Sequence, residues 1–223
     1  MFIKVVNPNT TWSMTATMDP PSIESHYDEA LAVPGILTEI EKGERDSVDG
    51  YVIACFGDPG LDAARELAGG PVVGIAEAAM RAAAVLGRGF SVVTTLARST
   101  GRAWDLAHRY GMRDACRGVH ACDLPVLALD SDPDARRIVT EACLDALSED
   151  GSDTIVLGCA GMADLCAHIS AEIGVPVVDG VAAATLTVPS LVTMGLATGK
   201  RGEFAPPPPK RYAGLLDGFT TGG

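Results

Sequence analysis

The chain has 223 residues, of which 47% are hydrophobic, and a formal net charge of −12 at pH 7. Its 17 lysines and arginines form neither a cluster nor a stripe, which argues against nucleic acid or an anionic membrane as a partner. The length allows one large domain or two lobes of about 100 residues each, and the hydrophobic content suits a buried sheet.

The chain begins with a strand-like run, residues 1–6, and lacks the charged, apolar and cleavage regions of a signal peptide. We therefore expect a cytoplasmic protein. Residues 181–199 are uncharged, but Pro189, Gly195 and four threonines within them disfavour a membrane-spanning helix.

The first half predicts strands at residues 2–6, 51–54 and 72–74 and helices at 35–44, 62–67 and 77–86. Between the first strand and the first of these helices, Asn9 or Thr10 can cap a helix that starts at Thr11. Asp19-Pro20-Pro21 cuts that helix short, and residues 21–28 are predicted to be a polar loop.

The second half predicts strands at residues 90–95, 119–129, 154–158 and 175–178. Its predicted helices run through 104–110, with Gly111 as the C-cap, and over 133–147 and 163–173, with a last helix after residue 178. Strands that alternate with helices and are continuously apolar indicate a parallel sheet covered on both faces.

The two halves repeat one plan around a cysteine at a strand end. Asp49 precedes Cys55 by six residues and Asp153 precedes Cys159 by six, and a Pro-Val-Val run follows each cysteine. We predict an α/β fold of two pseudosymmetric lobes, each a parallel-type sheet flanked by helices, with the active site in the cleft between them. The predicted division is 1–88 with about 181–215, then 89–180, then a disordered tail, 216–223.

The first half is shorter than the second. From Phe2 to Cys55 there are 53 residues and from Phe90 to Cys159 there are 69, and the first half has no counterpart of the strand at 119–129. A crossover between parallel strands needs about a dozen residues or more. Our hypothesis is that a helix end and a strand are absent between Met18 and Asp19, either deleted or left out as a disordered loop.

Cys55 and Cys159 both lie where parallel strands end, which is where open α/β sheets bind ligands. Two thiols that face each other across a cleft can remove a proton from one face of a carbon and return one to the other face, without a cofactor if the carbon is acidic. Either cysteine alone would more simply be a small buried hydrophobic residue. Their matched placement favours the catalytic interpretation.

The other four cysteines have no symmetric partners and are interpreted as structural. The sequence has no CxxC pair and no close Cys/His spacing, so neither a disulfide framework nor a zinc site is predicted. These four are Cys116, Cys122, Cys143 and Cys166.

Six motifs together resemble those of the hydantoin racemases, in the aspartate/glutamate racemase superfamily and its hydantoin/allantoin branch. The resemblance runs from Met1 to about Leu215 and implies two pseudosymmetric lobes, a cofactor-independent cysteine pair and a homo-oligomer. The motifs are Asn7-Pro8-Asn9-Thr10, Ser22-Ile23-Glu24 with His26-Tyr27-Asp28-Glu29, Cys55-Phe56-Gly57-Asp58-Pro59-Gly60, Val93-Thr94-Thr95-Leu96, Gly158-Cys159-Ala160-Gly161-Met162 and Asp179-Gly180-Val181-Ala182.

Carried over by position, the resemblance implies that Cys55 and Cys159 are the acid/base pair, each acting on one enantiomer of a 5-monosubstituted hydantoin. Ser22 and Ile23 either line the pocket for the substituent or belong to an ordinary loop, His26 is the histidine nearest to them, and Gly180 borders the site. Candidate groups that contact the substrate and its enolate are Asn9, Thr10, Phe56, Gly57, Thr94, Thr95, Ala160, Gly161 and Met162.

Other functions stay open at this point. The closest alternative is a racemase of allantoin, which is 5-ureidohydantoin. A cysteine-dependent decarboxylase and a ligand-binding protein without turnover are the next, although two cysteines disfavour the decarboxylase. No GxGxxG or P-loop pattern indicates a nucleotide, and neither a metal nor a cofactor is predicted.

Overall fold

The computed structural model describes residues 1–9 and 20–219 of the chain. It contains two parallel sheets. The first has the order β1-β2-β3, with β1 at Ile3–Val6, β2 at Gly50–Ile53 and β3 at Val72–Gly74. The second has the order β5-β4-β6-β7, with β4 at Phe90–Thr94, β5 at Cys116–Ala121, β6 at Thr154–Leu157 and β7 at Val177–Val178.

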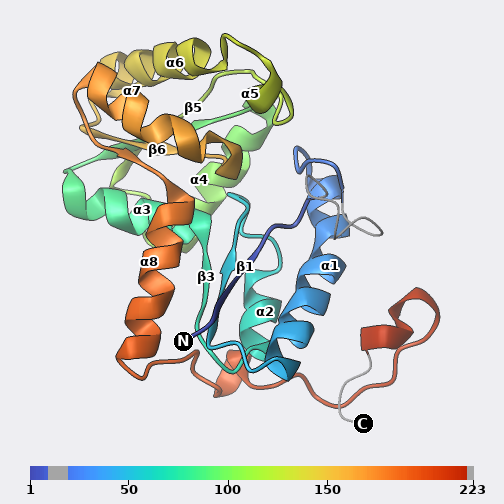
Figure 1. Ribbon diagram of the computed structural model, residues 1–223. Coiled ribbons are helices and arrows are strands. Elements are labelled where there is room, and N and C mark those ends of the chain that lie inside the picture. Colours follow the sequence, from blue (N-terminus) through green and yellow to red (C-terminus); the bar gives the residue numbers. More distant parts are fainter. Residues whose placement is uncertain (10–19, 220–223) are drawn as a thin grey trace.

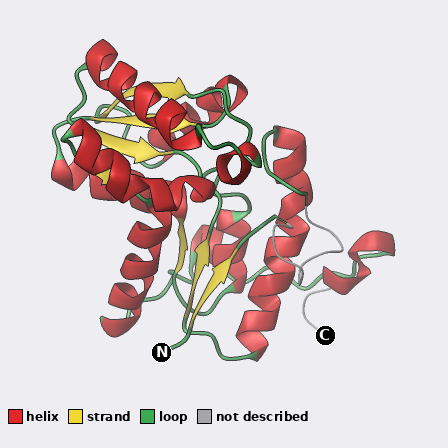
Figure 2. Ribbon diagram, turned by 45° about the horizontal axis from the view of Figure 1, so that its top comes forward, coloured by secondary structure: helices red, strands yellow, loops and turns green. Residues whose placement is uncertain are grey.

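Helices cover both sheets, which form separate lobes, one above the other in Figure 1 and at different inclinations in Figure 2. All residues of β2, β4 and β6 are buried, as expected for parallel strands between helical layers. The predicted two-lobed α/β fold is confirmed. The α-helices are α1 (His26–Arg45), α2 (Leu61–Leu67), α3 (Ile75–Leu86), α4 (Thr100–Arg109), α5 (Ala128–Ser131), α6 (Ala135–Asp150), α7 (Cys166–Ile173) and α8 (Gly180–Thr193).

The repeated aspartates perform the same task in both lobes. Asp49 accepts a hydrogen bond from the backbone N–H of Phe2, just before β1. Asp153 accepts hydrogen bonds from the backbone N–H groups of Arg88 and Gly89, just before β4, at 3.0 and 3.1 Å. Each carboxylate therefore ties the start of its own strand to the start of the neighbouring strand.

Two helices are exchanged between the halves of the chain. Helix α3 follows β3 of the first sheet but packs on β6, β4 and β7 of the second. Helix α8 follows β7 of the second sheet and packs on β1, β2 and β3 of the first, and the two helices also pack on each other (Figure 1). The predicted boundary at 88/89 falls between α3 and β4.

Helix α1 is longer than predicted. It begins at His26, whereas residues 21–28 were expected to be a loop and the helix was expected only from residue 35. The Ser25 side chain accepts a hydrogen bond from the Asp28 N–H and so caps the helix. Buried Ala32 and Ile36 lie on both sides of Pro34, so packing retains the helix across the proline.

Strand β5 is shorter than predicted, ending at Ala121 rather than at residue 129. Asp123 has a positive φ of 52°, which breaks the extended backbone. The apolar residues beyond it, Leu124 and Leu129, pack into the core of the second lobe from a loop and from α5. These residues are apolar because they are buried, and their pattern does not indicate that the strand continues.

The C-terminal segment carries two 3-10 turns, Gly202–Phe204 and Gly214–Phe219, and the second overlaps the first residues of the predicted tail, 216–223. Met18 and Asp19, the proposed site of the missing segment, lie outside the described residues. Among the helices that the structure describes, none is long and apolar enough to cross a membrane.

Candidate active site

Cys55 and Cys159 follow the carboxyl ends of β2 and β6, the middle strand of one sheet and an inner strand of the other. Both cysteines are half-buried and line one cavity of about 360 Å³. The fold therefore brings the two predicted catalytic cysteines together. The cavity is lined by Val5, Asn7, Asn9, Ile23, Ala54, Cys55, Phe56, Gly57, Thr94, Thr95, Ser99, Arg102, Ala103, Val126, Leu127, Asp130, Gly158, Cys159, Ala160 and Gly161.

The backbone turns after the two cysteines match. The Asp58 N–H donates to the Cys55 carbonyl at 2.9 Å, and the Met162 N–H donates to the Cys159 carbonyl at 3.1 Å. In each turn the N–H of the glycine two residues after the cysteine, Gly57 or Gly161, interacts with the thiol and lowers its pKa. The repeat in the sequence thus encodes a repeated thiol environment.

Burial is the larger influence on both thiols. It raises the pKa of Cys55 to about 12 and that of Cys159 to about 11, despite the glycine N–H groups. A helix dipole does little to stabilise a thiolate here, because α2 begins only at Leu61 and Cys159 precedes a 3-10 segment, Ala160–Leu165. Both cysteines are therefore thiols at neutral pH.

Thr94 ends β4, the strand next to β6 and Cys159, and Thr95 follows it; both threonines are buried. The Thr94 hydroxyl lies 3.3 Å from the Gly158 carbonyl, to which it donates, and 3.2 Å from the Ser99 hydroxyl. These contacts fix its orientation within the cavity wall.

Most of the other predicted site residues also line the cavity, namely Asn9, Ile23, Phe56, Gly57, Ala160 and Gly161. Three do not. Ser22 lies outside the lining, Met162 is fully buried in the core of the second lobe, and Gly180 begins α8, where a Cβ would come within 2.6 Å of the Ile75 carbonyl oxygen. Thr10 lies outside the described residues.

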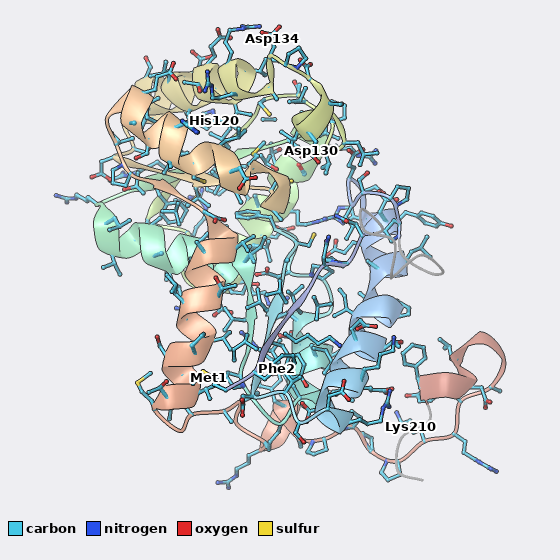
Figure 3. All side chains as sticks on the ribbon, viewed as in Figure 1. Met1, Phe2, His120, Asp130, Asp134 and Lys210 are labelled. Atoms are coloured by element: carbon cyan, nitrogen blue, oxygen red, sulfur yellow. The ribbon has the colours of Figure 1, made fainter. Side chains whose placement is uncertain are left out.

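The cavity also contains polar residues that the sequence did not single out. Arg102 comes from α4, and its side chain, 15% exposed, forms a 2.8 Å ion pair with Glu29 of α1 in the other lobe. Asp130 comes from α5, at the end of the second lobe nearest α1 (Figure 3). The only signal in the sequence was that both residues follow predicted strands, the kind of segment that carries sites in α/β folds.

These charges make the two thiols electrostatically unequal. Next to the dominant effect of burial, the Asp58 carboxylate raises the pKa of Cys55 and the Arg102 guanidinium lowers it. The carboxylates of Glu24 and Asp130 both raise the pKa of Cys159.

The remaining cysteines lie outside the cavity lining. Cys116, Cys143 and Cys166 are buried, and burial raises the pKa of each thiol to about 12. Cys122 is half-buried, and its thiol lies 3.7 Å from the Thr95 carbonyl. Among the described residues, no group of three histidine, cysteine or carboxylate side chains could hold a metal ion.

The family Asp/Glu/Hydantoin racemase matches residues 16–188 of the chain. The chain belongs to this family. A hydantoin racemase from Rhizobium meliloti is 48% identical, in an alignment that covers 96% of this chain and 98% of the relative. The predicted family and the predicted enzyme class, a racemase, are both confirmed.

Two solved structures are similar over nearly their whole length. An allantoin racemase from Klebsiella pneumoniae is 47% identical, with a TM-score of 0.93 and 98% of each chain covered. Another, from Pseudomonas fluorescens, is 35% identical, with a TM-score of 0.90 over 96% of this chain and 100% of the other.

The alignment with the Rhizobium protein is longer than this chain. It runs over 236 residues, more than the 223 of this chain. The relative therefore carries residues to which nothing in this chain corresponds.

Proposed function

We propose that this family member racemises 5-monosubstituted hydantoins by two-base proton transfer between Cys55 and Cys159, without a cofactor. The observation that carries the proposal is the pair of matched thiols, which come from different sheets, line one cavity and are each followed by the same turn. The relatives named as hydantoin and allantoin racemases support the substrate class.

The reaction begins when one cysteine, as its thiolate, takes the proton from C5 of the hydantoin. The electron pair of the C5–H bond moves onto the adjacent carbonyl oxygen, where fixed hydrogen-bond donors stabilise the enolate. The other cysteine, as its thiol, then donates a proton to the opposite face of C5 and becomes the thiolate. The product is the opposite enantiomer, and the enzyme is ready for the reverse direction.

The donors for the enolate come from the two matched turns and from β4. The candidates are the N–H groups of Phe56 and Ala160, directly after the two cysteines, and the hydroxyl of Thr95, directly after β4, because these residues line the cavity. Raised thiol pKa values assist the first step, since a thiolate with a higher pKa is the stronger base toward a weakly acidic carbon.

The cavity suits a small substrate. Its volume of about 360 Å³ falls in the range of roughly 300 to 1,000 Å³ that is typical of small-molecule sites. A 5-alkyl or 5-aryl hydantoin and allantoin are the two substrate types to be distinguished.

The variants Cys55→Ser and Cys159→Ser test the mechanism. Circular dichroism of an enantiopure hydantoin should show a loss of racemisation of about 100-fold or more in each, because a serine hydroxyl is a far weaker acid than a thiol. In deuterated water, each variant should still exchange C5–H of one enantiomer without inverting it, and the two variants should prefer opposite enantiomers.

Cys122→Ser is the matched control, since Cys122 is half-buried but does not line the cavity. It should racemise at the wild-type rate. Full racemisation by both Cys55→Ser and Cys159→Ser would exclude the two-thiol mechanism.

The proposal also includes a cytoplasmic homo-oligomer with the two-lobe division predicted above. Large hydrophobic side chains are exposed at the end of α3, within α8 and just after α8, and they support an interface there: Val85, Leu86, Leu186, Met194 and Leu196. Analytical ultracentrifugation should detect a dimer or larger species, and a monomer at micromolar concentration would contradict this part. Cell fractionation tests the location.

A further inference from the structure

Arg102 is the one lysine or arginine among the described residues that line the cavity. Its Nη2 lies 2.8 Å from the Glu29 carboxylate and 3.3 Å from the Nδ1 of His26, both on α1. Because α4 and α1 belong to different lobes, the guanidinium is held from across the cleft before any substrate arrives.

The guanidinium of Arg102 has further N–H donors, on Nε and Nη1. Arg102 Nε is buried without a hydrogen-bond acceptor, and Nη1 likewise donates to no group within the described part of the chain. Nη1 packs over Gly57, where a Cβ would lie 3.0 Å from it. The Nε donor is enclosed by the protein, whereas Nη1 lies beside Gly57 in the cavity lining, so an oxygen that a ligand brings to Nη1 would be favoured here.

The charges around Arg102 indicate which kind of oxygen fits. Glu29 already offsets the positive charge of Arg102, and Asp130 adds a negative charge to the cavity wall. An anionic group would therefore meet no net attraction. A neutral carbonyl oxygen can accept from the guanidinium without that repulsion.

The two matched turns place backbone N–H groups on both sides of the cavity, as a ring placed between two thiols requires, because Phe56 and Ala160 both line it. Arg102, in contrast, has no cationic counterpart among the described lining residues on the Cys159 side. It is therefore suited to the part of the substrate that lies to one side of the reacting carbon, which is the C5 substituent.

We propose that Arg102 determines substrate specificity by donating to a neutral carbonyl oxygen in the C5 substituent, as in a ureido or carbamoyl group. The protein would then prefer such hydantoins over those with hydrocarbon substituents. This inference rests on the proposed function and names the substrate class within it.

Two substrates of nearly equal size test the proposal. The ureido group of allantoin and the isobutyl group of 5-isobutylhydantoin each have four non-hydrogen atoms in a branched arrangement. Arg102→Met should lower kcat/KM for allantoin at least about tenfold and change kcat/KM for the isobutyl substrate less than about threefold. Arg102→Lys should restore part of the activity toward allantoin.

Arg109→Met is the matched control, because Arg109 also lies on α4 and pairs with Asp62 of the other lobe, but does not line the cavity. Arg109→Met should leave the ratio of kcat/KM for allantoin to kcat/KM for 5-isobutylhydantoin unchanged. Equal losses for both substrates in Arg102→Met, or no loss for either, would overturn the proposal.

Failure of the proposed function would look different, since the wild-type protein would then racemise neither hydantoin. Isothermal titration calorimetry would still decide the role of Arg102. The proposal requires that allantoin bind the wild-type protein more tightly than 5-isobutylhydantoin and that Arg102→Met abolish this difference. Equal affinities in the wild-type protein would overturn it.

Discussion

At the scale of single residues, the two thiols share a backbone turn but differ in what surrounds them. Cys55 lies near the Asp58 carboxylate and the Arg102 cation, and Cys159 lies near the carboxylates of Glu24 and Asp130. Burial raises the pKa of both thiols above their usual range. The working form of the enzyme, with one thiolate and one thiol, is therefore a small fraction of the protein at neutral pH.

This predicts a steep dependence of activity on pH. While the pH lies below both thiol pKa values, the fraction of protein with one thiolate rises about tenfold per pH unit. We expect kcat/KM for racemisation to rise from pH 7 to pH 9, after subtraction of the uncatalysed racemisation at each pH. A flat or falling profile would show that the reacting thiolate forms at a much lower pH.

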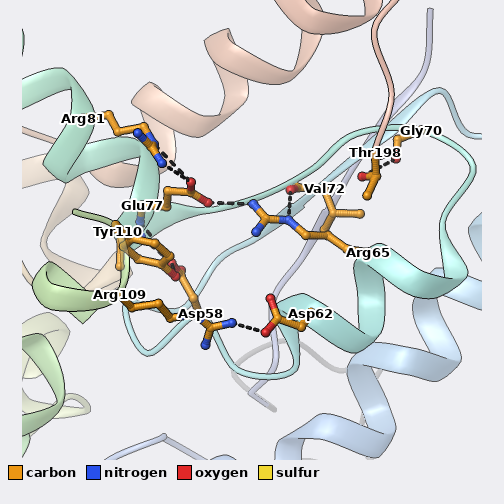
Figure 4. A network of polar contacts seen from close by, with 11 residues as sticks. Asp58, Asp62, Arg65, Gly70, Val72, Glu77, Arg81, Arg109, Tyr110 and Thr198 are labelled. Atoms are coloured by element: carbon orange, nitrogen blue, oxygen red, sulfur yellow. Dashed lines mark hydrogen bonds and ion pairs between the residues drawn. The ribbon is translucent and has the colours of Figure 1, made fainter. Parts of the chain in front are cut away.

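At the scale of elements, Asp58 joins the Cys55 turn to two helices, as Figure 4 shows. Its carboxylate accepts from the N–H groups of Ala76 and Glu77 in the first turn of α3, both at 3.0 Å, and from the Tyr110 hydroxyl after α4 at 2.6 Å. Asp58 itself has a positive φ of 45°. Three hydrogen bonds hold this unfavourable backbone in place and with it the turn that carries Gly57.

Asp58 also predicts an unusual dependence of stability on pH. Burial raises its pKa from 3.8 to about 7, although its hydrogen bonds lower it. The folded state then binds the proton more tightly than the unfolded state, so this contribution is fully present below about pH 4 and is lost as the pH rises through about 7.

Urea denaturation of the wild-type protein and of Asp58→Asn measures this effect. The wild-type stability relative to the variant should fall between pH 4.5 and pH 8, by up to about 4 kcal/mol at about 1.4 kcal/mol per pKa unit. A relative stability that instead rises over this range would show that Asp58 is ionised throughout.

The strands and most helices could be predicted from the sequence because buried parallel strands are continuously apolar and glycines mark the helix ends. The start of helix α1 could not be predicted, because proline usually ends or interrupts a helix. Here, packing on both sides of Pro34 keeps the helix continuous. The end of β5 was missed because Leu124 and Leu129 are apolar for reasons of tertiary packing.

In the site, the cysteine pair could be predicted because the chain repeats itself around it. Arg102 could not, because its position depends on how α4 is placed against α1, and a single sequence carries no signal for that contact between lobes.

At the scale of the molecule, contacts between the lobes close around the cavity. Besides the Arg102–Glu29 pair, the Glu24 carboxylate accepts a hydrogen bond from the Val126 backbone N–H at 2.8 Å. Val126 lines the cavity and so does Ile23, the neighbour of Glu24. The loop before α1 is thus fastened to the segment before α5 at the cavity.

Glu24→Ala removes this contact and should weaken substrate binding in the cavity without destabilising the hydrophobic cores of the lobes. We expect KM to rise about tenfold, with a change of less than about 1 kcal/mol in the free energy of unfolding, as for a single partly exposed hydrogen bond. Steady-state kinetics and urea denaturation measure the two quantities.

Glu141→Ala, which removes a carboxylate that pairs with Arg137 within α6 on the surface, is the control and should change neither. An unchanged KM in Glu24→Ala would show that substrate binding does not depend on this fastening.

The exchange of α3 and α8 between the two sheets has a consequence for how the chain folds and how it arose. Neither half can complete its hydrophobic core alone, because one of the helices that cover each sheet is encoded in the other half. An ancestral protein made of one such half would have needed a helix from a second copy to cover its sheet. Two copies that exchange a helix in this way form a domain-swapped dimer. In the present chain that association is intramolecular, so the two lobes should unfold in one cooperative transition rather than as two independent domains.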